Sequence, residues 1–150
     1  QFIAAHADAE EMVDRLYAFS NAIEGLNKGE MEELYTRTFD INPVSSLEVG
    51  WHLYGETYER GAFLVQMRNL LRRCGVEESS ELPDHLTSVL HAVGRMEQAE
   101  ADEFIRSRVL KALGKILEGF TGQANPYEHV LVSVQMLLTM MVRSHEGVAS

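Results

Sequence analysis

Four polar residues in the middle of the chain are spaced so that a helix would bring them onto one face. They stand at i, i+3, i+4 and i+7: Glu81, Asp84, His85 and Ser88. Serine, histidine and aspartate are the residue types of a nucleophilic hydrolase. Triads are usually gathered from distant segments around a Gly-x-Ser-x-Gly elbow, which this sequence lacks. A hydrolase therefore stays an alternative, and we favour a recognition role for Asp84 and His85, because a carboxylate beside an imidazole binds cationic or hydrogen-bonding partners.

The remaining chemistry-bearing residue types do not form recognisable sites. Six histidines are scattered, with no HExxH, paired ExxH or Cys-x-x-Cys motif. The single cysteine, Cys74, excludes an intrachain disulfide. Neither GxGxxG nor GxxxxGK[ST] occurs, so nucleotide hydrolysis is unsupported. We expect no catalytic residues, no metal and no stably bound cofactor.

Charge points to a basic partner. The chain carries 13 Lys and Arg against 23 Asp and Glu, a net charge of −10, which argues against nucleic acid and anionic membranes. Residues 8–33 and 77–103 hold eight acids each, whereas four cations gather in 106–115. Charge runs are usually solvated faces. The two acidic stretches nevertheless border segments 43–51 and 84–85, where a basic partner would be attracted.

Apolar residues recur at intervals of three and four along most of the chain, which is the spacing of amphipathic helices. The pattern predicts helices over about 12–26, 30–39, 45–55, 58–74, 83–93, 105–120 and 125–142. No alternating strand pattern and no internal repeat is present. The predicted fold is all-α, a single-domain bundle of six or seven helices over residues 1–150.

Several helix ends have recognisable signals. Ser45 and Glu48 have the spacing of a capping box, and Pro83 suits the first position of a helix. Residues 97–103 read as an acidic break. Asn125 is a candidate N-cap, and the helix that follows is apolar nearly all round between 130 and 142, which is typical of a central helix.

Two features have both a structural and a binding interpretation. Trp51, the only tryptophan, follows a proline-bearing loop, and it is either a buried anchor or part of an exposed pocket. Met136, Met140 and Met141 are favoured as core filler, with an adaptable groove for a peptide helix as the alternative.

Two ordered motifs carry a resemblance to a known family. The first is LYTRTFDINP (34–43), continued by SL (46–47), WHLYGE (51–56) and RG (60–61); the second is ELPDHL (81–86). Together they resemble the nitrate reductase assembly chaperones, the NarJ branch of the redox-enzyme maturation proteins that also include TorD and DmsD. The second motif is similar to the acidic-Pro-Asp-His motif of that family, and the resemblance spans about residues 30–95.

The resemblance implies an all-helical cytoplasmic chaperone without catalytic activity. Such a protein binds the N-terminal twin-arginine leader, or its remnant, on the catalytic subunit of a molybdoenzyme such as nitrate reductase. It holds the apoenzyme open for insertion of molybdopterin guanine dinucleotide and delays membrane docking. The implied peptide-binding residues are Asp84 and His85, joined by Pro43, Trp51 and Leu53. We expect a monomer that binds no nucleic acid and does not enter the membrane.

The ends of the chain add one expectation. No signal peptide is recognisable after Gln1, and the run 130–142 is shorter than the ~20 apolar residues that a membrane span needs. Because members of the family carry a further helix before this point, we expect the full-length chain to have an N-terminal helix that is missing here.

A generic helical adaptor for an amphipathic peptide is the other alternative function, besides the hydrolase.

Overall fold

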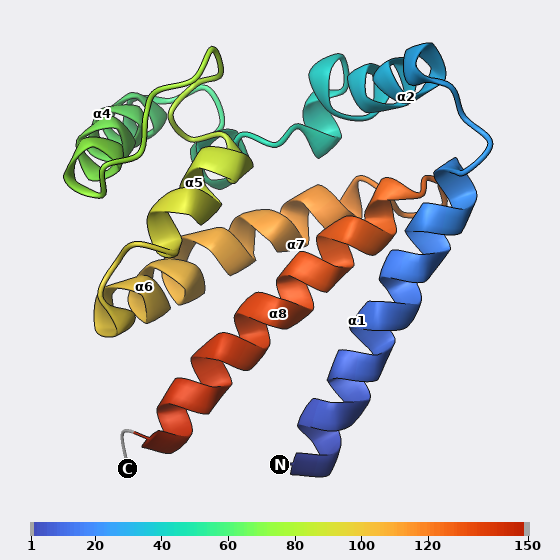
Figure 1. Ribbon diagram of the computed structural model, residues 1–150. Helices are drawn as coiled ribbons and strands as arrows, with labels where there is room; N and C mark the ends of the chain where they lie inside the picture. Colours follow the sequence, from blue (N-terminus) through green and yellow to red (C-terminus); the bar gives the residue numbers. More distant parts are fainter. Residues whose placement is uncertain (1, 149–150) are drawn as a thin grey trace. The chain divides into compact units, whose positions relative to one another are not determined.

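The computed structural model describes residues 2–148 and confirms the all-α prediction (Figure 1). Seven continuous helical stretches run through the described residues, none of which belongs to a strand. They are α1 (Phe2–Ile23), α2 (Lys28–Tyr35) continued by the π-helical η1 (Thr36–Asp40), α3 (Val49–Tyr54), α4 (Tyr58–Arg73), α5 (Leu86–Val93), α6 (Gln98–Phe104) continued by the π-helical η3 (Ile105–Val109) and α7 (Leu110–Glu118), and α8 (Tyr127–Val148). A short 3-10 turn, η2 (Pro43–Ser45), precedes α3.

The chain divides into two compact units. The first contains residues 1–46 and 117–150, and the second contains residues 47–116. The single-domain organisation over residues 1–150 stays a prediction.

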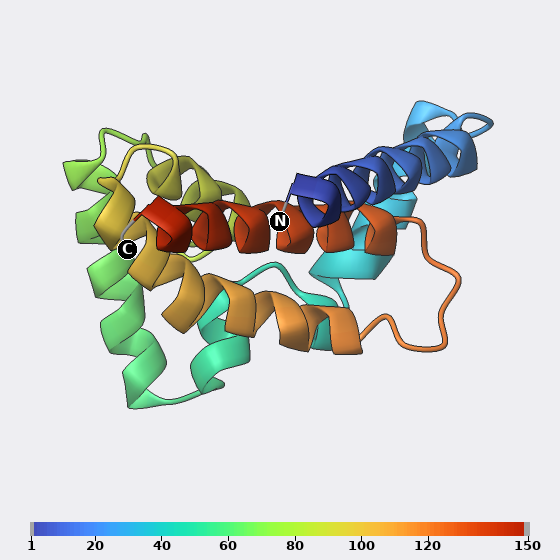
Figure 2. The ribbon, with the colours of Figure 1, turned by 90° about the horizontal axis from the view of Figure 1, so that it is seen from below.

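The first unit is built on α1 and α8, which lie side by side and antiparallel (Figures 1 and 2). Phe19 on α1 contacts Tyr127 at the start of α8, with ring centroids 5.3 Å apart. Tyr127 also meets Phe39 at 4.9 Å. Asn125 caps α8 as predicted: its Oδ1 accepts from the Tyr127 N–H at 3.0 Å, and its Nδ2 donates to Thr38 Oγ1 at 2.8 Å. An aromatic cluster thus joins the η1 segment to both long helices.

Burial in the first unit is weaker than the sequence pattern predicted. Leu16, an apolar residue of the amphipathic helix predicted over residues 12–26, has 48% of its surface exposed. Leu137 on α8 is similarly exposed, and the buried positions of that helix are Leu131, Ser133, Leu138 and Val142. The prediction that α8 is wrapped on all sides is therefore wrong. The three methionines of α8 are half-buried.

The second unit has a fully buried apolar core. Helix α4 packs against α3 and α5. Every helix of this unit contributes buried apolar side chains, among them Val49, Phe63, Met67, Leu71, Val89, Ala101, Ile105, Val109, Leu113 and Ile116. Helix α4 is followed by a left-handed glycine, Gly75, with φ of 69°.

Three predicted helix boundaries are wrong for local reasons. Ser45 Oγ donates to the Thr38 carbonyl at 2.6 Å, so Ser45 caps no helix, and α3 begins after an extended Glu48. Pro83 precedes α5 rather than opening it, because His85 is the N-cap. Residues 98–104 are helical, since alanine and glutamate favour helix and Ala101 and Asp102 are buried.

Candidate functional site

Residues 47–49, which follow the start of the first motif, meet the second motif in the second unit through a short antiparallel backbone pairing. The Val49 N–H donates to the Asp84 carbonyl at 2.9 Å, and the Leu86 N–H donates to the Leu47 carbonyl at 2.8 Å. Glu48 and His85 form the bridge between these bonds. The pairing fixes where α3 and α5 begin, because each helix starts directly after its extended segment.

Asp84 lies at the centre of this pairing and is fully buried. Its Oδ2 accepts a hydrogen bond from the Gly50 N–H at 2.8 Å, in the first turn of α3. A carboxylate there satisfies a free helix-end donor and interacts favourably with the helix dipole. Its Oδ1 has no hydrogen-bond partner among the residues that the structure describes. Burial raises the pKa of the Asp84 carboxyl above its ordinary value, an effect that Arg60 and the Gly50 N–H reduce.

Gly50 is required by this arrangement. A Cβ at position 50 would lie 2.7 Å from Asp84 Oδ2 and 2.8 Å from Phe63 Cδ1. Both distances are well below van der Waals contact, so any larger residue would displace the carboxylate or the ring. Gly50 thus lets the α3 backbone approach Asp84 closely.

Arg60, on the first turns of α4, connects this buried group to the surface. Its Nη2 lies 3.0 Å from Glu48 Oε2 and 3.6 Å from Asp84 Oδ2. Its guanidinium lies 5.9 Å from the centre of the Trp51 ring, at a cation–π distance. We call Glu48, Gly50, Arg60 and Asp84 the buried polar cluster; it couples the starts of α3 and α4 to the 84–86 segment.

His85 has a local structural role. It is buried, and its Nδ1 accepts from the Thr87 N–H at 3.3 Å while lying 2.8 Å from Thr87 Oγ1. Asp84 Oδ2 is bonded to Gly50 and Oδ1 to no group, so the carboxylate does not orient the imidazole. This geometry counts against the Ser88–His85–Asp84 hydrolase, because a triad needs the base held by its carboxylate.

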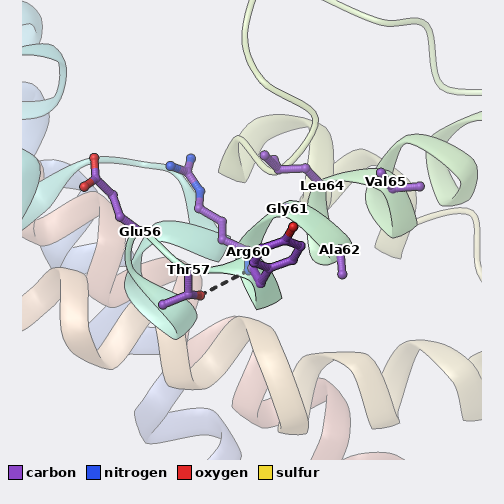
Figure 3. A pocket seen from close by; sticks show the side chains of 8 residues that line it. Glu56, Thr57, Arg60, Gly61, Ala62, Leu64 and Val65 are labelled. Carbon is purple, nitrogen blue, oxygen red and sulfur yellow. Dashed lines mark hydrogen bonds between the residues drawn. The ribbon is translucent and has the colours of Figure 1, made fainter.

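A shallow groove of about 790 Å³ lies against the outer face of α4 (Figure 3). Its lining side chains come from the loop before α4 and from the first turns of that helix: Glu56, Thr57, Tyr58, Arg60, Gly61, Ala62, Leu64 and Val65. Tyr58 is 96% exposed and Val65 58% exposed. Thr57 Oγ1 accepts from the Arg60 N–H, the dashed bond in Figure 3, and so fixes the start of α4.

The structure brings together three of the five predicted site residues. Asp84, His85 and Trp51 belong to or adjoin the buried polar cluster. Leu53, farther along α3, lines a separate cavity, together with Arg108 and other residues. Pro43 belongs to the first unit, where it is exposed at the start of η2.

Sequence reasoning missed the roles of Gly50 and Arg60. A glycine inside a helix costs about 1 kcal/mol of stability relative to alanine. That cost was the available signal, because it indicates that another part of the protein approaches the backbone of Gly50 closely. Arg60 gave no local signal, because its partners lie 12 and 24 residues away.

The described part of the chain contains neither a candidate membrane span nor a candidate metal site. No helix there is both long and apolar enough to cross a membrane. Between residues 2 and 148, no three His, Cys, Asp or Glu side chains are grouped so that they could hold a metal ion.

Comparison with known proteins adds the family. The model of the nitrate reductase delta subunit family matches residues 4–133. Two curated proteins, from Escherichia coli K12 and Escherichia coli O157:H7, are each described as nitrate reductase molybdenum cofactor assembly chaperone NarJ. Each is 33% identical over 73 residues, a stretch that spans 48% of this chain and 31% of the relative's length. Because the family model covers most of the sequence, the chain belongs to the nitrate reductase delta subunit family.

Proposed function

We propose that this chain is a cytoplasmic assembly chaperone for the catalytic subunit of a molybdoenzyme such as nitrate reductase. It binds the N-terminal twin-arginine leader or its remnant, and it assists insertion of molybdopterin guanine dinucleotide before membrane docking. It has no catalytic activity and acts as a monomer. Family membership and the description of the Escherichia coli relatives support the assembly role. The observation that carries the peptide-binding part is the groove on α4.

The groove has the chemistry of a site for an amphipathic peptide helix. Tyr58, Ala62 and Val65 stand at helical spacing and form an exposed apolar stripe on α4. Such stripes accept the apolar face of a helix. Glu56 and Glu59 are exposed beside it, and among the described residues no Lys, Arg or His lies within 4.0 Å of either carboxylate. These two carboxylates are available to the basic residues of a leader.

Asp84 and His85 support this site from inside the protein. Because both are buried, we assign them a positioning role: Asp84 holds Gly50 and faces Arg60, while His85 begins α5. Arg60 is itself part of the groove lining. Trp51, Leu53 and Pro43, which are partly or fully exposed, stay proposed contacts of the client.

Calorimetric titration with a peptide that covers the basic and apolar N-terminal segment of a nitrate reductase catalytic subunit tests the proposal. We expect Tyr58→Ala and Val65→Asp each to weaken binding about tenfold or more, as loss of an interface anchor does. Val13→Asp is the matched control, because Val13 is 50% exposed and lies on α1 in the first unit. Absence of binding by the folded protein, or equal losses in all three variants, would contradict the proposal.

The generic helical adaptor uses the same groove but needs no basic residues in its partner. Titration with a peptide whose Lys and Arg are replaced by Gln separates the two functions. A leader chaperone should lose most of its affinity and its salt dependence, because ion pairs with Glu56 and Glu59 are screened by salt. Unchanged affinity would favour the adaptor.

A further inference from the structure

A second cavity in the second unit has a different chemistry from the groove. Its volume is about 380 Å³, and it lies between the end of α3 and the η3–α7 stretch. The lining residues are Leu53, Tyr54, Ser107, Arg108, Lys111 and Lys115. Three cations and two hydroxyl-bearing residues thus face one small hollow in a protein whose net charge is −10.

The helix geometry gathers the cations. Arg108, Lys111 and Lys115 are separated by three and four residues, so they share one face of the stretch. Ser107 and Arg108 lie in the π-helical turn η3, which contacts α3. Single π-helical turns are frequent at functional sites.

The cations of this cavity differ from three other arginines of the unit in having no acidic partner. Arg60, Arg68 and Arg73 each lie within 4.0 Å of a carboxylate. In the part of the chain that the structure describes, no carboxylate lies within that distance of Arg108, Lys111 or Lys115. The nearby C-terminus of α3 supplies a negative partial charge of at most about half an electron, which does not balance three cations.

We propose that this cavity binds a small multiply charged anion of the pyrophosphate class. Lys and Arg are the usual phosphate-binding side chains, Arg through two parallel hydrogen bonds and Lys as a point charge. Tyr54 and Ser107 supply hydroxyl groups that donate to phosphate oxygens, and Leu53 supplies an apolar wall. The volume suits a small ligand, whereas a helix of ~10–12 Å diameter would not fit inside it.

Titration of the intact chain with inorganic pyrophosphate, followed by amide chemical shifts, tests this site. We expect saturable shifts at Ser107, Arg108, Lys111 and Lys115, weaker binding of sulfate at matched ionic strength, and affinity that falls with added salt. Lys111→Gln with Lys115→Gln should reduce affinity at least about tenfold, the effect of losing one charge-assisted hydrogen bond. Restoring both charges as Lys111→Arg with Lys115→Arg should recover most of the binding.

The matched control removes two exposed arginines that do not line the cavity, Arg37→Gln with Arg72→Gln, and should change the affinity by less than about twofold, since solvent-screened charges outside a site contribute little. Equal loss in the control pair would overturn the site, because net charge alone would then explain the binding. Absence of saturable shifts would also overturn it. Tighter binding of a polyglutamate peptide at the same four residues would replace it with an acidic protein segment as the ligand. None of these outcomes depends on leader binding at α4.

Discussion

The two units of the chain are stabilised by different kinds of contact. The first unit has 12 acidic and 4 basic residues, a net charge of −8, and is joined by aromatic packing around Phe39 and Tyr127. The second has 11 acidic and 9 basic residues, a net charge of −2, and contains the buried polar cluster. Aromatic packing tolerates small changes in shape, whereas a buried carboxylate needs its partners at fixed positions. The candidate groove and cavity both belong to the unit with the stricter geometry.

The two units also carry very different shares of the net charge of −10. Most of the excess acid lies in the first unit rather than around the groove. Attraction of a basic leader to the groove therefore rests on the local carboxylates of Glu56 and Glu59. The acidic first unit supplies a field that acts on encounter rates and is screened within about 8–10 Å at physiological salt.

The largest expected effect tests the aromatic packing of the first unit. Phe39 is buried and contacts the rings of Tyr35, Phe120 and Tyr127. Phe39→Ala should lower the free energy of unfolding by about 3–5 kcal/mol, because it removes a buried ring and leaves a cavity. Hydrogen exchange should locate the loss in α8 and η1, while the exposed Ile41→Ala changes little. An equal loss of hydrogen-exchange protection in the second unit would contradict the distinction between the two units.

Gly50→Ala tests the close approach in the second unit. The new Cβ would clash with Asp84 Oδ2 and the Phe63 ring, and overpacking of this kind costs about 1–3 kcal/mol. Chemical denaturation should show a loss near the upper end of that range. Gly114→Ala is the matched control, because it meets no atom within 4 Å and alanine favours helix. A neutral Gly50→Ala would show that Asp84 does not need its present position.

Arg60→Met tests the ion pairs of the buried polar cluster. It leaves the carboxylates of Glu48 and Asp84 without their cation, and because Arg60 keeps some solvent contact we expect a loss of about 2 kcal/mol, below the range for a fully buried pair. Arg68→Met on the same helix removes an exposed pair with Glu78 and should cost less than about 1 kcal/mol. Similar losses for both variants in urea titrations would mean that burial adds nothing to the Arg60 contacts.

The smallest effect concerns pH. Because burial raises the pKa of Asp84, the folded state holds this proton more tightly than the unfolded state does. The contribution of Asp84 to stability should therefore fall as pH rises from about 4, the ordinary pKa of aspartic acid, through the raised pKa. The asparagine of Asp84→Asn does not titrate. The free energy of unfolding of this variant should therefore increase relative to that of the wild type as pH rises. The opposite slope would show that Arg60 outweighs burial.

Local sequence patterns predicted most of the helices but not the centre of the site. Helix α4, its glycine end and the Asn125 cap follow from spacing and capping residues, which act over a few positions. The start of α3 depends on Asp84, 34 residues away from Gly50, so no local pattern reveals it. Family resemblance singled out Asp84 and His85, whereas their burial required the structure.

The proposed binding of a molybdoenzyme leader to the groove on α4 has one direct test. Amide chemical shifts of the intact chain, recorded during titration with the leader peptide, test it directly. We expect saturable shifts at Glu56, Tyr58, Gly61 and Val65, which line the groove. We expect smaller shifts at Trp51, because the guanidinium of Arg60 lies over its ring and moves when the peptide binds. Shifts confined to the first unit, for example along the exposed residues Val13, Leu16 and Tyr17 of α1, would contradict it.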